Sequence, residues 1–380
     1  MKKSYLFTPG PTSVPPEALK EMSRPIFHHR TTRYRKMFEN ITDSLKKLFR
    51  TENDVLTFTS SGSGAMEASV VNLLSSGDKV ITVNGGKFGE RWGNICRIYG
   101  VDVIEIKTEW GASVNPCQVE EILKQGCNNE IQAVFVTLSE TSTGVVNDVK
   151  SIAEIVAKTP AVLVVDAISG LGADDIRTDD WHVDVLITGS QKGLMIPPGL
   201  AFASVSEKAW GKIVKSSLPK FYFDMEKARK SLISFDTPYT PATSLIRGLK
   251  VVLDMIHDEG VDNVIARHAK YAKASRAAVK AMGLELFAPD SPSNAVTAVK
   301  VPEGIDGDSL IKHLLDEYGI QVAGGQAHLK GKIIRFAHLG YYDRFDVIMV
   351  LSGIEMGLKD IGYDISLGCG IKAAEELLVG

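Results

Sequence analysis

The sequence has few cysteines and no long apolar run. Its four cysteines are spread along 380 residues as Cys96, Cys117, Cys127 and Cys369, with no CxxC pair. This spacing argues against a zinc site or a disulfide framework and fits a reducing compartment. No apolar run approaches the roughly 20 residues that a membrane span needs, and the N-terminus lacks the apolar stretch of a signal peptide. We therefore expect a cytoplasmic protein with no metal site and no membrane partner.

An excess of either charge is also missing. The 43 basic and 46 acidic residues leave a net charge of −3, which gives no reason to expect a nucleic acid or an anionic membrane as partner. No internal repeat or low-complexity segment occurs. A hydrophobic content of 44% over this length is enough for two domains with a large core.

From residue 55 onward, short apolar runs alternate with helical stretches. This alternation predicts an α/β domain with a mainly parallel sheet. The expected strands are residues 55–59, 79–83, 101–106, 131–137, 161–165, 183–188 and 201–205. Open α/β sheets bind ligands beyond the carboxyl ends of their strands, so the segments that follow these runs are expected to form one site.

Two of these strand ends carry a lysine and an aspartate. Lys192 follows one strand on a loop between glycines and a Pro-Pro turn, and Asp166 follows the strand before it. Taken alone, the lysine is more simply explained as a solvated loop residue. The pair, however, is what pyridoxal phosphate (PLP) chemistry requires. The lysine forms a Schiff base with the cofactor, and the carboxylate keeps the ring nitrogen protonated.

The segment Ser61-Gly62-Ser63 follows the first of these strands and precedes an expected helix at residues 65–74. Small residues at a helix start let backbone N–H groups point at an anion, and the helix dipole adds to the attraction. A dinucleotide-binding loop does not fit, because Glu67 stands where the third glycine of that motif belongs. We interpret the segment as a phosphate cup, although such a turn is often only a turn.

Three motifs resemble the class V aminotransferases of PLP fold type I. They are TPGP at residues 8–11, VDAxS at 165–169 and SQKxxxxPPG at 190–199. The resemblance covers residue 7 to about 358 and is strongest to alanine–glyoxylate, serine–glyoxylate and serine–pyruvate aminotransferases. It implies a homodimer with shared active sites, in which an N-terminal arm containing Gly10 crosses the mouth of the site.

The resemblance also implies roles for single residues around the cofactor. Phe88 stands where many relatives have a tryptophan that stacks on the pyridine ring. Thr141 matches a hydroxyl residue near the ring 3′-oxygen, Gln191 matches a neighbour of the phosphate, and Ile168 is a further cofactor contact. Without the resemblance, Phe88 would be read as a core residue that begins a helix at residues 88–99.

Two more positions carry implied roles. The polar loop 234–244 is expected to reach the phosphate of the neighbouring subunit through Tyr239 or Thr240. Arg335 lies in an apolar strand, where an arginine is costly to bury without an anion. A structural salt bridge is one explanation. The I-R-x4-G segment ending at Gly340 favours the other, a grip on the substrate α-carboxylate.

We expect three parts: an N-terminal arm (1–20) packed on the small domain, a large PLP-binding α/β domain (21–260) and a small C-terminal α+β domain (261–380). Around this boundary the sequence predicts helices at residues 245–257 and 261–282. In the small domain it predicts strands at 295–301 and 333–337 and a helix at 309–318 with Asp308 as N-cap. A last helix is expected at 344–360.

The sequence therefore predicts a PLP-dependent aminotransferase. Lys192 is expected to move a proton between the substrate Cα and the cofactor. A single cation, Arg335, and glycine-lined walls favour alanine or serine as donor and glyoxylate or pyruvate as acceptor. Aspartate stays open as a donor, because His28, His29, Arg30 or Lys87 could pair with a second carboxylate, which costs several kcal/mol to bury unpaired.

Two other functions remain as alternatives. A cysteine desulfurase-like lyase is disfavoured, because Gln191 replaces the histidine that precedes its lysine and Cys369 lies too late in the chain. A cofactor-binding subunit without catalysis is disfavoured by the intact set of Lys192, Asp166 and Arg335.

Overall fold

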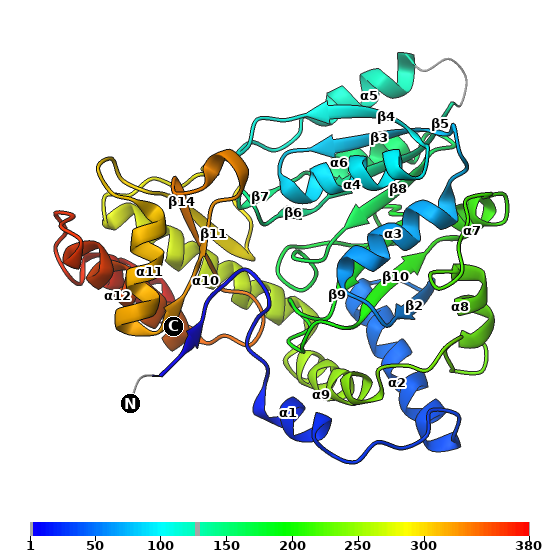
Figure 1. Cartoon of the computed structure of the whole chain (residues 1–380), viewed down its shortest axis with the longest axis horizontal. Coiled ribbons are helices and arrows are strands. Elements are labelled where there is room, and N and C mark those ends of the chain that lie inside the picture. The colour runs from blue at the N-terminus through cyan, green and yellow to red at the C-terminus, as the bar shows by residue number, and fades with distance from the viewer. Residues whose placement is uncertain (1–2, 126–129, 380) are drawn as a thin grey trace.

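The computed structural model describes residues 3–125 and 130–379, so Cys127 lies outside the described residues. Figure 1 shows a large sheet flanked by helices on the right and a smaller assembly built from the C-terminal part on the left. The large sheet has seven strands in the order β2-β10-β9-β8-β5-β3-β4 within the described residues. Their bounds in that order are Asp54–Phe58, Ala201–Val205, Val185–Gly189, Val162–Asp166, Ile131–Thr137, Lys79–Asn84 and Asp102–Lys107.

The sheet is mainly parallel, as the sequence predicts. Only β10 runs antiparallel to its neighbours β2 and β9, while the pairs β3–β4, β3–β5, β5–β8 and β8–β9 are parallel. All seven expected strands occur: two have the expected bounds, and the ends of the other five differ by at most two residues. Because β2, β8, β9, β5 and β3 point the same way, the segments that follow them meet at one edge of the sheet.

Each strand contributes side chains to two hydrophobic cores, one on each face of the sheet. Along β5, Ala133 and Phe135 belong to one buried cluster, whereas Val134 and Val136 belong to the other. This is the period-two alternation of a pleated strand. The first face is covered by α3 (Gly62–Leu73), α4 (Lys87–Ile98), α7 (Glu207–Ile213) and α8 (Met225–Leu232). The second is covered by α2 (Thr32–Phe49), α5 (Pro116–Gln125), α6 (Val149–Val156) and α9 (Thr243–Glu259).

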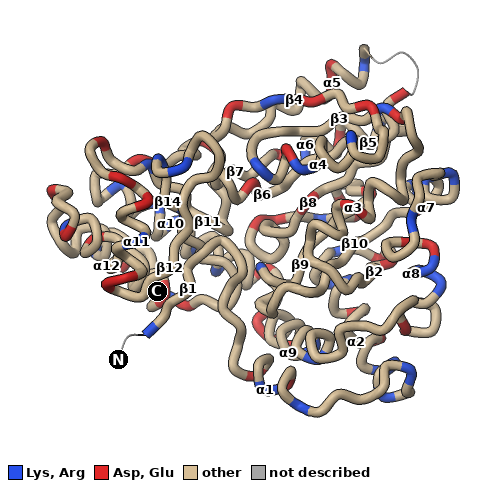
Figure 2. The backbone as a smooth tube through the Cα atoms, in the orientation of Figure 1, with Lys and Arg blue, Asp and Glu red and all other residues tan. Residues whose placement is uncertain are grey.

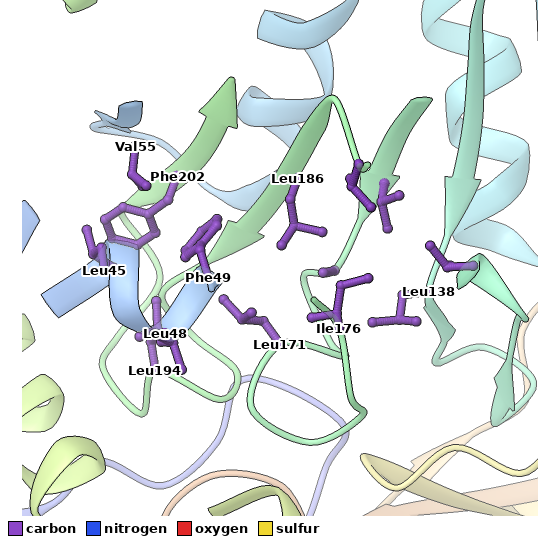
Figure 3. Packing of buried hydrophobic residues seen from close by; sticks show 14 of the residues in the cluster. Leu45, Leu48, Phe49, Val55, Leu138, Leu171, Ile176, Leu186, Leu194 and Phe202 are labelled. Atoms are coloured by element: carbon purple, nitrogen blue, oxygen red, sulfur yellow. The ribbon is translucent and has the colours of Figure 1, made fainter. Parts of the chain in front are cut away.

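Figure 3 shows part of this second core, where Leu45 and Phe49 of α2 pack toward Leu186 of β9 and Phe202 of β10. These side chains are nearly fully buried. Each contributes roughly 1.5–3 kcal/mol by leaving water. The lysine loop rests on the same cluster, since Leu194 and Met195 are also members.

The smaller assembly has an antiparallel sheet in the order β11-β14-β13. Its strands are Val296–Lys300, Ile333–Ala337 and Ala323–Gly324 in that order. The helices around it are α10 (Val261–Ala281), α11 (Gly307–Tyr318), α12 (Arg344–Asp360) and α13 (Cys369–Leu378), with a 3-10 turn η1 at Ala327–Leu329. We propose that the domains divide at about residue 260, between α9 and α10.

Two sequence predictions in this part are wrong. The cap of α11 is Asp306 and not Asp308, because the Asp306 carboxylate accepts the Ser309 backbone N–H at 2.9 Å. The helix 344–360 is not the last one, since α13 follows it. The start of α13 is held by the buried carboxylate of Glu355, which accepts the Gly370 N–H at 2.6 Å. Glu355 and Gly370 meet only through the tertiary fold.

The N-terminal arm spans both parts. Strand β1 (Tyr5–Leu6) pairs with β12 (Ile320–Gln321) of the small sheet region. Helix α1 (Pro16–Met22) packs against α9 of the large part. The arm therefore passes from the small assembly to the large part.

A short hairpin of β6 (Ser139–Glu140) and β7 (Val145–Val146) follows β5 in the chain.

Charged residues of both signs are spread over the whole fold. Figure 2 shows basic and acidic residues interspersed along the chain. In the part of the chain that the structure describes, no helix is both long and apolar enough to cross a membrane.

Candidate active site

The loop that carries Lys192 is held rigidly after β9. Ser190 donates its backbone N–H to the Leu200 carbonyl at 2.9 Å and its hydroxyl to the Pro197 carbonyl at 2.7 Å. Gly193 is pressed against the Leu171 carbonyl so closely that a Cβ there would overlap it. The loop leaves Lys192 little freedom, as expected for a residue that must be positioned for chemistry.

The Lys192 ammonium lies in a buried position under the N-terminal arm. Its residue is 7% exposed, and Nζ donates to the Pro9 carbonyl. Gly10 has a φ of +124° and lies directly against the lysine side chain, so no other residue fits there. Burial, with Arg335 and Arg91 adding to it, lowers the pKa of Lys192 to about 8 against the opposing pull of Asp166.

Asp166 is the last residue of β8 and is fully buried. One carboxylate oxygen accepts the Ile168 backbone N–H at 2.8 Å. Burial raises the pKa of Asp166 to about 7, with nearby Glu140 adding to the rise and Arg91 and Lys192 opposing it. A cationic partner on a ligand would favour the ionised form, as a protonated ring nitrogen does.

Between these groups lies a cavity of about 280 Å³. Most of the residues expected in the site line it, namely Gly10, Ser61, Gly62, Ser63, Phe88, Asp166, Ile168, Gln191 and Lys192. Pro11, Arg91, Ser139, Ser169 and Pro198 line it too and were given no role from the sequence. Thr141, Arg335, Tyr239 and Thr240 are not among its lining residues.

The far end of the cavity is suited to an anion. Ser61 precedes α3 in an extended conformation, and its carbonyl accepts the Gly64 N–H at 2.9 Å. Among the described residues, the N–H groups of Gly62 and Ser63 are left without a backbone partner. A Cβ on Gly62 would come 2.5 Å from Ile168 Cδ1, so the backbone there packs tightly. Gln191 Oε1 is buried and has no hydrogen-bond partner among the described residues. Buried polar atoms normally have a partner, so this end of the cavity fits a polar ligand such as a phosphate.

Arg335 lies beside the cavity with its charge unpaired by any described carboxylate within 4 Å. Its Nε and one Nη donate to the Gly324 carbonyl at 3.0 and 2.6 Å, and the other Nη donates to the Thr141 carbonyl at 2.6 Å. Burial lowers the pKa of Arg335 to about 10, and Glu140 opposes the change. Arg335 therefore does not form the structural salt bridge that the sequence left open with any carboxylate of the described residues. The Thr141 hydroxyl lies 3.3 Å from Ser169 Oγ.

Comparisons with known proteins agree with this geometry. The sequence model of the aminotransferase class-V family matches residues 4–342. The L-aspartate–glyoxylate aminotransferase of Paracoccus denitrificans is 39% identical over 98% of this chain and 95% of its own. A protein of Synechococcus sp. (strain PCC 6716) named soluble hydrogenase, small subunit, is 41% identical over 99% and 98%. The alanine–glyoxylate aminotransferase structure from Nostoc sp. is 27% identical, with a TM-score of 0.90 over 94% of this chain and 96% of that one.

The chain is a class V aminotransferase.

As a class V aminotransferase it uses PLP, and it has the fold-type I architecture of its structural neighbours. The predicted family, fold class and cofactor are confirmed. The cavity is of suitable polarity for this cofactor: a buried lysine and carboxylate line it, and the start of α3 and Gln191 offer polar groups at its far end.

Two residues of this class V aminotransferase were missed from the sequence. Glu140 is 1% exposed and accepts the backbone N–H groups of Phe88 at 3.1 Å and Gly89 at 2.9 Å. Its carboxylate thereby caps the first turn of α4, and burial raises its pKa against the effect of these bonds. Arg91 projects from the second turn of α4 to the cavity wall. Glu140 lies in the segment after β5, among residues with hydroxyl side chains. A single carboxylate in such a segment is a signal that the sequence carries.

Other candidate residues lie elsewhere. In the single chain, Tyr239 donates its hydroxyl to the Phe221 carbonyl at 2.8 Å, and together with Thr240 it lines a separate hollow beside β2. His28 is exposed and stacks on His29 with centroids 4.8 Å apart. Lys87 pairs with Glu90 at 2.5 Å. Neither these residues nor Arg30 line the cavity.

Proposed function

We propose that Lys192 holds PLP in this cavity and that the enzyme transfers the amino group of a small amino acid, alanine or serine, to glyoxylate or pyruvate. The supporting observation is the buried Lys192 beside Asp166 at neighbouring strand ends, around one cavity. Bound PLP supplies an aldehyde that exchanges with amines and a ring that accepts electrons from the substrate Cα.

The residues around the cavity have separate tasks in this proposal. Lys192, whose pKa burial lowers to about 8, moves a proton between the substrate Cα and the cofactor. Asp166 stabilises positive charge on the ring nitrogen, and Phe88 covers one face of the ring. Ser61, Gly62, Ser63 and Gln191 hold the phosphate, with Ile168 and Thr141 as neighbours of the ring.

Substrate choice follows from the cations near the cavity. Arg335 has no anionic partner among residues 3–125 and 130–379, and we propose that it binds the substrate α-carboxylate, with Gly10 limiting the space beside Lys192. Aspartate stays the alternative donor, because the Paracoccus relative is named for it and Arg91 brings a second cation to the cavity wall.

A desulfurase-like lyase fits less well. Cys369 lies at the start of α13, where burial and Glu355 raise the pKa of its thiol. A raised pKa disfavours the thiolate that a sulfur-transfer enzyme needs. We also propose a cytoplasmic homodimer in which Tyr239 or Thr240 reaches the phosphate bound in the second copy of the chain.

Covalent mapping tests the cofactor residue. After PLP loading and borohydride reduction, peptide mass mapping is expected to find the adduct on Lys192 and to find none in Lys192→Ala. Lys212→Ala is the matched control, because burial also lowers the pKa of Lys212, on the remote helix α7. An adduct on another lysine of the wild-type protein contradicts the assignment.

Donor choice is tested by mixing the PLP form with one amino acid at a time and following pyridoxamine phosphate by absorbance. Alanine or serine is expected to convert the cofactor faster than aspartate or glutamate. The reverse order overturns the monocarboxylate proposal.

Mixed dimers test the shared site. A Lys192→Ala chain combined with a Thr240→Ala or Tyr239→Phe chain yields one site with both lesions and one with neither. Mixtures are expected to regain activity that each parent lacks. No regain from inactive parents means that the sites share neither residue between chains.

A further inference from the structure

Arg91 connects the two helices that begin at the cavity. Its Nη1 donates to Ser63 Oγ in the first turn of α3 at 2.9 Å. Its Cζ lies 4.9 Å from the centroid of the Phe88 ring on its own helix, α4. Figure 1 shows α3 and α4 on the same side of the large sheet. The guanidinium is therefore fixed beside the Ser61–Ser63 segment and not extended into solvent.

This guanidinium forms no ion pair within 4.0 Å in the part of the chain that the structure describes, although it is close enough to Asp166 to oppose the rise in the pKa of that carboxyl group. Arg97, two turns further along the same helix, pairs with Glu105 at 3.3 Å. Arg229 pairs with both Asp54 and Glu207 at 2.8 Å. A partly buried cation on a cavity wall without an anion of its own is suited to bind one from a ligand.

The starts of α3 and α4 differ in whether their N–H groups are free to bind this anion. The first N–H groups of α4 are already taken by the Glu140 carboxylate, which accepts from Phe88 and Gly89. The start of α3 has no such carboxylate, and only there does Arg91 contribute its charge, through Ser63. An anion in the cavity thus finds the N–H groups of Gly62 and Ser63, the Ser63 hydroxyl and the Arg91 guanidinium together at α3.

We infer that Arg91 is a ligand of the cofactor phosphate, together with Ser63 and the first turn of α3. The inference rests on the proposed function and deepens it. A guanidinium engaged by phosphate is not available to a second substrate carboxylate, so the inference also supports short monocarboxylic donors over aspartate.

The test compares ligands with and without a phosphate group on the apo-protein. Pyridoxamine 5′-phosphate and pyridoxamine are titrated by calorimetry into wild type, Arg91→Met, Arg91→Lys and Arg97→Met. Neither ligand reacts with Lys192, so the readout is binding and not turnover. Methionine keeps a long apolar stem against Phe88 and removes the charge. Arg97→Met removes a positive charge from the same helix away from the cavity.

Arg91→Met is expected to weaken the binding of pyridoxamine 5′-phosphate by about ten-fold or more, the effect of losing a charged hydrogen bond. The affinity for pyridoxamine is expected to stay unchanged. Arg91→Lys is expected to lose less affinity than Arg91→Met, and only for the phosphorylated ligand. This second variant keeps the test valid if Arg91→Met does not fold. Arg97→Met is expected to match wild type. Inorganic phosphate is expected to compete with the phosphorylated ligand in wild type and less in Arg91→Met.

Other outcomes overturn the inference. Equal weakening of both ligands means that Arg91 acts by supporting the Phe88 ring. No weakening of either, with a raised KM for aspartate, makes Arg91 a substrate ligand instead. If the wild-type protein binds both ligands equally well, it has no site for the phosphate group. A wild-type protein that binds neither ligand refutes the proposed function itself, and the inference with it.

Discussion

The cavity and the junction between the two lobes both contain a buried aspartate, and they satisfy it differently. At the junction, Asp174 accepts the Asn294 backbone N–H at 2.9 Å and the Ser293 hydroxyl at 3.0 Å. Ser293 Oγ also lies 2.6 Å from Ser139 Oγ. These bonds tie the loop before β11 to the large part. In the cavity, Asp166 accepts one backbone N–H, from Ile168 at 2.8 Å, while Gln191 Oε1 has no hydrogen-bond partner among the described residues.

Burial raises the pKa of both carboxyl groups, to about 6 for Asp174 and about 7 for Asp166. A perturbed pKa alone therefore does not distinguish a functional carboxyl group from a structural one. What distinguishes them is the set of partners. The chain supplies hydrogen bonds to both Asp174 oxygens, whereas the Gln191 Oε1 atom in the cavity has no partner among the described residues and is available to a ligand.

The largest expected effect separates the two carboxyl groups by activity. Asp166→Asn is expected to lower transamination by about 10²–10⁴-fold, because the amide carries no charge to hold the ring nitrogen protonated. Asp174→Asn is expected to change activity little. Steady-state kinetics with thermal unfolding of both variants measures this. Near-normal turnover in Asp166→Asn means that its carboxylate is structural.

The next prediction concerns how the Asp174 carboxyl group makes the stability of the protein depend on pH. The pKa of Asp174 is raised above its unfolded value of about 3.9. Its stabilising contribution is therefore complete below about pH 4 and is lost as the pH rises through about 6. Relative to Asp174→Asn, wild type is expected to lose about 2 kcal/mol in unfolding free energy over these two pH units. Urea unfolding at several pH values measures it, and a constant difference contradicts the assignment.

A smaller effect is expected for the arginines of the two regions. Arg335→Lys removes the planar fork beside the cavity and is expected to raise the donor KM about ten-fold, since a charged hydrogen bond contributes about 1.5–3 kcal/mol. Arg276 donates to the Ser293 carbonyl at 3.1 Å in the junction, so Arg276→Lys serves as the control with an unchanged KM. An unchanged KM in Arg335→Lys places the carboxylate site elsewhere.

The smallest effect concerns the ring that covers the cofactor. Phe88→Trp enlarges the stacking surface and is expected to tighten PLP binding by a few-fold, since aromatic pairs contribute about 0.5–1.5 kcal/mol beyond their area. Equilibrium titration of the apo-protein measures it. Weaker binding indicates that Arg91, which lies over this ring, leaves no room for the larger side chain.

The parallel sheet and the grouping of its strand ends follow from the sequence pattern. Alternating apolar runs specify strands, and parallel strands bring their carboxyl ends to one edge, so Asp166, Lys192 and Ser61–Ser63 could be placed together from their order alone. Motif resemblance then identified the family. Strand ends moved by a residue or two, and the Asp308 cap failed because Asp306 also satisfies the capping pattern at that helix start.

Packing between distant segments sets which groups complete the cavity. Pro9 and Gly10 cover Lys192 because the arm pairs with β12, more than 300 residues later in the chain. Glu140 reaches the start of α4, and Arg91 reaches Ser63, because the hairpin and both helices pack at the same sheet edge. These contacts depend on packing between segments with no local pattern linking them. Hydrophobic periodicity specifies each element, but it does not specify which polar groups of different elements meet.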